Sequence, residues 1–142
     1  MFIRNRPQDL SATRSENSYF RDYSLNKLQG LAEGNINFTI EMLQIFLQNA
    51  DKDISELKAS CLYNNWERVG TLAHKLIPAC EYLQLDKLAR FLKDIEINSN
   101  NVQDRIKLVQ LVDHACDTYS QIRPMIIIDL HKLKKDKVLG NY

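Results

Sequence analysis

The sequence predicts an all-α protein: an antiparallel four-helix bundle with a short N-terminal helix and a C-terminal extension. Three observations favour this fold class. Apolar residues recur at steps of three and four along four long segments, which is the spacing of one buried helix face. Only a few residues connect these segments, as is usual between antiparallel neighbours. The chain shows no alternation of apolar and polar residues of the kind that marks a half-buried strand.

The first two helices precede the centre of the chain. A short helix is expected over 25–32, with Ser24 as its N-cap and Gly34 at its end. The next helix is expected over 38–62, capped by Asn37. The apolar stripe that predicts it consists of Ile40, Leu43, Leu47, Ala50, Ile54, Leu57 and Cys61.

Three breaks define the later helices. Asn64 and Glu67 resemble a capping box and predict a helix over about 65–83. A break at Gln84–Asp86 precedes a third stripe, formed by Leu85, Leu88, Leu92 and Ile95. The sequence NSNN (98–101) is predicted to be a loop whose Asn101 caps the last helix. The apolar positions expected on that helix are Val102, Ile106, Val109, Val112, Cys116 and Tyr119.

The chain is expected to divide into three segments. Residues 1–22 are polar and of mixed charge, and we interpret them as a tail or linker. Residues 23–123 hold the bundle, and residues 124–142 form a C-terminal extension. Pro124 predicts a break or kink, while the isoleucines after it suit either an extended or a helical backbone.

The composition excludes several classes of function. A formal net charge of +1 gives no electrostatic reason to expect nucleic acid or anionic lipid as a partner. No apolar run is long enough to span a membrane, and the start MFIRNRPQDL lacks the apolar core of a signal peptide. We therefore expect a cytoplasmic protein without direct membrane insertion. The three cysteines are odd in number and far apart, which favours free thiols in a reducing compartment.

Neither a nucleotide-using enzyme nor a metal site is expected. The four glycines do not form a phosphate-binding loop, and no hydrolase or kinase signature occurs. His114 and Cys116 are two residues apart on a helix and so face different directions, which makes them a poor pair of metal ligands. His131 lies in the charged stretch HKLKKDK, which is typical of a solvated tail.

His74 is predicted to point to solvent. With Val69 at zero on a helical wheel, the apolar residues Ala73, Leu76, Cys80 and Leu83 lie within about 40°. His74 lies about 140° away, on the opposite side. One turn from it are Gly70, Thr71, Ile77 and Pro78.

Gly70 and Pro78 are costly in a helix, at about 1 and about 3 kcal/mol respectively. Two interpretations stay open at this point. Either these residues leave His74 open to a large partner, or Gly70 allows close helix packing and Pro78 bends the helix around the core.

The stretch WERVGTLAHKLIPACEYLQLDKLARFLKDIE (66–96) resembles the core of a histidine-containing phosphotransfer (HPt) domain of two-component phosphorelays. The matching features are Ala73-His74, the apolar Leu76, the break near 84–86 and Ile95-Glu96. The preceding helix, FTIEMLQIFLQNADKDISELKASCLYNNW (38–66), is also similar to that family. The resemblance covers about residues 24–120, and the chain is similar to phosphotransfer domains at the ends of hybrid sensor histidine kinases.

This resemblance implies a phosphocarrier, not an enzyme. His74 would accept a phosphoryl group from a receiver-domain aspartate and pass it to a second receiver, which is a response-regulator partner. The chain itself would need no cofactor, since Mg²⁺ is expected on the receiver. The family commonly has Lys at +3 and Gly at +4, where this chain has Ile77 and Pro78. The basic residues that remain as candidates to neutralise the phosphoryl group are Lys75, Lys87 and Arg90.

Two further alternatives remain. Phe38, Met42, Ile45 and Phe46 either bury the short first helix or, in part, dock a receiver; burial is favoured for most of their area. The chain as a whole could instead be a non-catalytic helical interaction or dimerisation module, in which His74 is an incidental surface residue.

Overall fold

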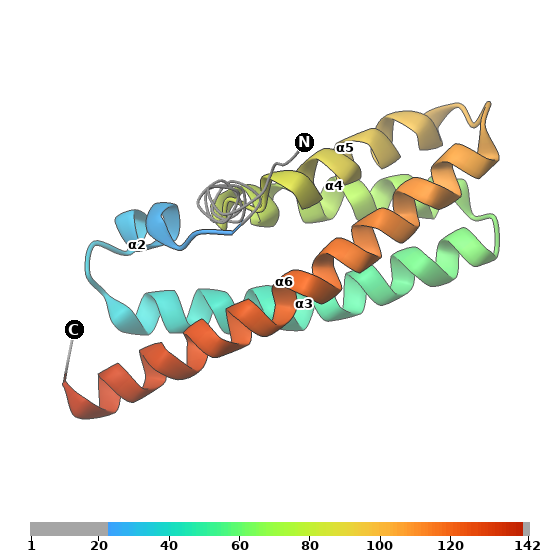
Figure 1. Cartoon of the computed structure of the whole chain (residues 1–142). Helices are drawn as coiled ribbons and strands as arrows, with labels where there is room; N and C mark the ends of the chain where they lie inside the picture. Colours follow the sequence, from blue (N-terminus) through green and yellow to red (C-terminus); the bar gives the residue numbers. More distant parts are fainter. Residues whose placement is uncertain (1–22, 141–142) are drawn as a thin grey trace, which may run out of the picture.

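The computed structural model describes residues 23–140, and within that range it is all helix and turn. The helices are α2 (Asn26–Ala32), α3 (Ile36–Leu62), α4 (Trp66–Tyr82), α5 (Asp86–Asn100) and α6 (Arg105–Leu139). Figure 1 shows the four long helices running up and down beside one another, with short α2 at one end. The all-α fold class and the bundle are confirmed. The predicted tail, 1–22, lies outside the described residues, and the division into three segments stays a prediction.

Three of the long helices begin with an Asx cap. The side-chain oxygens of Asn35, Asn65 and Asp104 each accept a hydrogen bond from the backbone N–H three residues on, at 3.1, 3.2 and 2.9 Å. The predicted caps, Asn37, Asn64 and Asn101, were therefore wrong by one to three residues. Neighbouring Asn and Asp residues have similar capping ability, so composition alone does not choose among them.

Two similar turns join the helices around α4. Asn64 and Gln84 are in the left-handed region, with φ of 60° and 55°. In each turn the next amide bonds back to a carbonyl in the last helical turn: Asn65 to Ser60 and Leu85 to Cys80, at 2.9 and 2.8 Å. This closure satisfies carbonyls at the helix end and reverses the chain within about three residues. The turns hold α4 antiparallel to both α3 and α5.

The buried stripe of α3 is the predicted one, since all seven of its members are buried. On α6 the predicted stripe was correct in part: Val112 and Tyr119 are buried, and Val102 and Cys116 are partly buried against the core. Ile106 and Val109 are exposed, and the loop predicted at 98–101 is instead mostly the last turn of α5, which runs to Asn100. The buried α6 stripe comprises Leu108, Val112, Ala115, Tyr119, Ile122, Ile126 and Leu130. Ile106 and Val109 were wrongly assigned to the buried face, because isolated β-branched residues also occur on a solvent face.

No break occurs at Pro124. α6 continues through it to Leu139, a length of about 50 Å. Proline lacks only one amide, and packing on both sides offsets that loss: Ile126 and Leu130 are buried behind it. Farther on, Leu133 and Asp136 line a depression that also includes residues of α2 and the start of α3. The extension therefore continues the last helix and packs along the bundle (Figure 1).

Candidate functional site

α4 carries His74 on its solvent side. The predicted inner face is correct, because Val69, Leu72, Ala73, Leu76 and Cys80 are all buried. The side chain of His74 is 74% exposed. The orientation predicted for the imidazole is thus confirmed, while its chemical role stays a prediction.

The imidazole is oriented by a carboxylate from the neighbouring helix. Nδ1 of His74 lies 2.7 Å from Oε2 of Glu96 on α5. An ionised carboxylate only accepts hydrogen bonds, so Nδ1 carries the proton and donates it. In the neutral ring, Nε2 then holds the free lone pair. Glu96 fixes both the ring orientation and the tautomer, and its position here was not predicted as a site contact.

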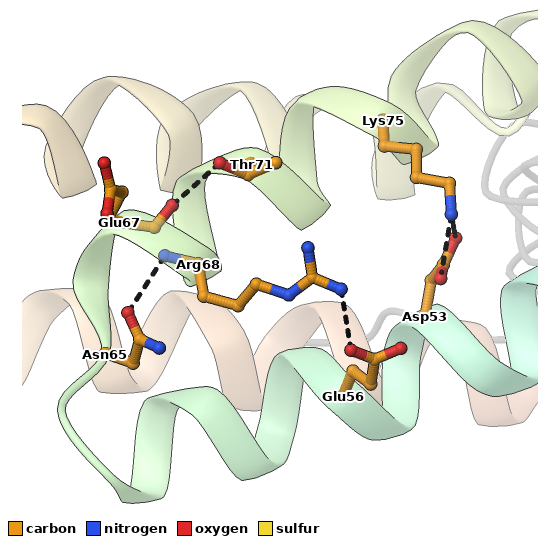
Figure 2. Close-up of polar contacts among 7 residues, drawn as sticks. All are labelled: Asp53, Glu56, Asn65, Glu67, Arg68, Thr71 and Lys75. Carbon is orange, nitrogen blue, oxygen red and sulfur yellow. Dashed lines mark hydrogen bonds and ion pairs between the residues drawn. The ribbon is translucent and has the colours of Figure 1, made fainter.

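A polar groove of about 530 Å³ runs from His74 toward the start of α4. Thr71 lies in it one turn before His74, and its hydroxyl donates to the carbonyl of Glu67 at 3.0 Å (Figure 2). The groove is lined by Trp66, Glu67, Gly70, Thr71, His74, Glu96, Ser99 and Asn100. Its charged side chains, Glu67 and Glu96, are acidic. The site therefore offers an exposed nucleophile but little positive charge.

Gly70 allows α5 to approach α4. A Cβ at this position would clash with Oγ of Ser99 and would lie 3.3 Å from its Cβ. The packing interpretation therefore holds for Gly70. Gly70 also lines the groove, so a long side chain there would fill space beside the imidazole. Pro78 is exposed within an uninterrupted α4, and Ile77 is partly buried against the core.

Lys75 points to α3, away from the groove. Its Nζ lies 3.2 and 3.3 Å from the two carboxylate oxygens of Asp53. Figure 2 shows this pair beside a second one, Arg68 with Glu56 at 2.7 Å, on the same seam between α3 and α4. Asp53 is buried, and Lys75 is its partner across the seam.

Lys87 and Arg90 lie nearer the start of α5 than Glu96, the residue that contacts the imidazole. They precede Glu96 on α5 by nine and six residues, which is about 13 and 9 Å along the helix. Neither lines the groove. The structure therefore brings Gly70 and Thr71 to His74, and leaves the three predicted basic residues, Lys75, Lys87 and Arg90, away from it.

An apolar cavity of about 140 Å³ lies between α2, α3 and α4, on the other side of Lys75. Phe46 is buried and Met42 partly buried, whereas Phe38 and Ile45 keep exposed surface. The apolar side chains in the first half of α3 therefore have two roles. Some cover the core beside Leu28 of α2, and others keep surface that is exposed to solvent.

The other histidines are on α6. His114 is exposed and stacks on Phe91, with ring centroids 5.4 Å apart, and His131 is exposed. Residues 23–140 contain no group of three or more His, Cys, Asp or Glu side chains suited to a metal ion. The helices of this same range include none that is long and apolar enough to cross a membrane.

Comparison with known families decides the identity of the bundle. A family model described as Hpt domain matches residues 41–122, which is more than half of the chain. The chain belongs to the Hpt domain family. Hpt domains act in phosphorelays as histidine phosphotransfer proteins, and they interact with receiver domains as phosphocarriers instead of enzymes. The match spans α4 and α5 completely, so His74 and Glu96 both lie within it. Neither the curated proteins nor the solved structures include a significant match.

Proposed function

We propose that this Hpt domain is a phosphorelay intermediate in which His74 accepts a phosphoryl group from the aspartyl phosphate of one receiver and passes it to another. The observation that carries the proposal is the exposed imidazole whose Nδ1 is held by Glu96. Phosphoryl transfer mostly requires an oriented nucleophile and stabilised charge, and the receiver is expected to bring both Mg²⁺ and the aspartate. No catalytic constellation is then needed on this chain.

The transfer follows from the tautomer. Nε2 attacks phosphorus, an N–P bond forms, and the bond from phosphorus to the aspartyl oxygen breaks with its electron pair going to the carboxylate. The ring gains positive charge as the bond forms, and Glu96, at 2.7 Å from Nδ1, stabilises that charge. Return of the phosphoryl group to a second aspartate reverses these steps and restores the neutral ring.

The docking surface proposed for the receiver is the open part of α3 next to the apolar cavity. Ile45 is exposed there, and Tyr82 from the end of α4 lines the same cavity. A hybrid sensor histidine kinase is the expected source of one receiver, which would place the protein in the cytoplasm. Free cysteines at positions 61, 80 and 116 agree with a reducing compartment.

The test is phosphorylation by a phosphorylated receiver domain, with detection of acid-labile, base-stable label. His74→Gln should fold normally, with a stability change of about 0.5 kcal/mol or less, and should accept no label. His114→Gln and His131→Gln are the matched controls and should label as the unmodified protein does. Label retained by the His74 variant would show that another residue is the acceptor.

A further inference from the structure

A phosphoryl group on His74 needs a cation that the groove does not hold. The group would bring a charge of about −1.5 to −2, and charge stabilisation is the main requirement of its transfer. The charged side chains that line the groove belong to Glu67 and Glu96. Among the described residues, no lysine or arginine lines it. Once the receiver and its Mg²⁺ have left, a basic side chain that moves in from nearby would stabilise this charge.

Lys75 is the nearest basic residue in sequence, but it is held elsewhere. Its partner Asp53 has a side chain only 3% exposed. If Lys75 left, the carboxylate of Asp53 would stay buried without its counter-charge, which is strongly unfavourable. Lys75 also starts about 100° round the helix from His74. This lysine is therefore committed to the α3–α4 seam.

Lys93 is placed differently. It lies on α5 three residues before Glu96, about 4.5 Å along the helix, and it is exposed. Its Nζ is 3.0 Å from Oε2 of Glu81 on α4. Glu81 is seven residues after His74, so the two lie within about 20° on one stripe of α4. The contacts His74–Glu96 and Lys93–Glu81 thus follow one another along the outer edge of the α4–α5 seam.

The pair that holds Lys93 is easily exchanged. The side chains of Lys93 and Glu81 are 51% and 48% exposed, so either charge can return to water when the pair opens. Exposed ion pairs of this kind contribute little to stability. A doubly charged phosphoryl group one turn away would compete with a single exposed carboxylate for the ammonium. Arg90 and Lys87 lie about one and two turns farther along α5 from Glu96 than Lys93 does.

We propose that Lys93 is the residue that neutralises the phosphoryl group on His74, by exchanging Glu81 for the phosphoryl oxygens. The proposal rests on the proposed function of His74. It makes Glu81 a positioning residue, because Glu81 holds Lys93 on the seam before phosphorylation. No bond is made or broken in this exchange; one ion pair replaces another.

The test is the equilibrium constant for phosphoryl partition between His74 and a receiver domain that phosphorylates the unmodified chain, approached from both directions. Lys93→Gln should shift it toward the receiver by about threefold to tenfold, and Lys93→Arg should restore most of the loss. Glu81→Gln should shift it toward His74, and this gain should vanish in the Glu81→Gln/Lys93→Gln double variant.

The matched control is the Asp53→Asn/Lys75→Gln double variant, which removes the neighbouring lysine without leaving a buried charge. It should fold and leave the equilibrium within about twofold of the unmodified protein. An unchanged equilibrium in Lys93→Gln, or a loss in the control equal to that expected for Lys93→Gln, would overturn the assignment. Failure of the unmodified chain to accept phosphate from any receiver tested would instead count against the proposed function. Thermal melting of each variant separates a structural loss from a loss of charge.

Discussion

Arg123 binds both carboxylate oxygens of Asp51, with Nε–Oδ1 and Nη2–Oδ2 distances of 2.8 and 2.9 Å. The hydroxyl of Tyr119 donates to the same carboxylate at 2.5 Å. These contacts join α6 to α3 just before Pro124, where the family match ends at residue 122. They therefore hold α6 against α3 at the end of the length that the family model matches.

Replacing Arg123 by lysine should loosen this connection. An ammonium cannot make the two parallel hydrogen bonds that a guanidinium makes with a carboxylate. The pair is partly exposed, so we expect a loss of about 1 kcal/mol or less in the free energy of unfolding, measured by urea denaturation. Hydrogen exchange should rise in α6 after residue 123 more than in α4. Equal protection of both helices in the variant would show that the pair does not hold the extension.

The ion pair between Asp51 and Arg123 should make the free energy of unfolding depend on pH. The hydrogen bonds from Arg123 lower the pKa of Asp51 below its ordinary value of 3.8, although partial burial opposes them. A carboxyl whose pKa is lower in the folded state contributes stability above its unfolded pKa, and loses it as the pH falls through the folded pKa. Asp51→Asn should therefore be less stable than the unmodified protein at pH 7, and the difference should shrink below about pH 4. Urea denaturation from pH 7 to pH 3 measures it; a constant difference would be contrary to this account.

Gly70 and Ser99 set the distance between α4 and α5. Gly70→Ala should destabilise the bundle by about 1–2 kcal/mol, because the added methyl group would overlap Oγ of Ser99. Adding Ser99→Ala should recover most of that loss, since the hydroxyl is the nearest obstacle. Thermal and urea denaturation of the single and double variants give the comparison. If Gly70→Ala alone raised stability, helix propensity would outweigh the contact.

Much of the bundle could be predicted from the sequence, because buried apolar residues recur at helical spacing along each long helix. The α3 stripe and the outward direction of His74 depend only on helical period, and both were predicted correctly. The helix caps and the first turns of the α6 stripe were not predicted correctly, because chemically similar residues stand at adjacent positions. Pro124 was misjudged because the packing of Ile126 and Leu130, which offsets the missing amide, is a tertiary effect.

The contact between His74 and Glu96 illustrates what a single helix period cannot reveal. The two residues are each eleven positions from Leu85, which lies in the turn between α4 and α5. Antiparallel helices joined by a short turn bring residues equidistant from that turn to the same level, so a count outward from Leu85 would have found Glu96. The ion pair between Lys75 and Asp53 could not be predicted in this way. It depends on the burial of the Asp53 carboxylate, which is set by the packing of α3.

The cysteines should react slowly in the folded protein. Burial raises the pKa of the Cys116 thiol from 9.0 to about 11, and burial also raises the pKa of Cys61. A raised pKa lowers the thiolate fraction at a given pH, here by about a hundredfold for Cys116 near pH 8. A chromogenic disulfide reagent at pH 8 should therefore label the native protein far more slowly than the protein unfolded in guanidinium. Equally fast labelling of both would mean that the thiols are open to solvent.

Ile126 and Ile128 differ in burial on the part of α6 that follows Pro124. Ile126 is fully buried, whereas Ile128, two residues along the same helix, is 53% exposed. Ile126→Ala should cost about 2–4 kcal/mol, because it removes three buried carbons and leaves a cavity between α6 and the bundle. Ile128→Ala removes the same atoms from a solvent face and should change stability by about 0.5 kcal/mol or less. Urea denaturation followed by circular dichroism measures both. Equally small losses of stability in the two variants would mean that α6 beyond Pro124 unfolds independently. A much larger loss in Ile126→Ala would make the extension part of one cooperative unit with the bundle that presents His74.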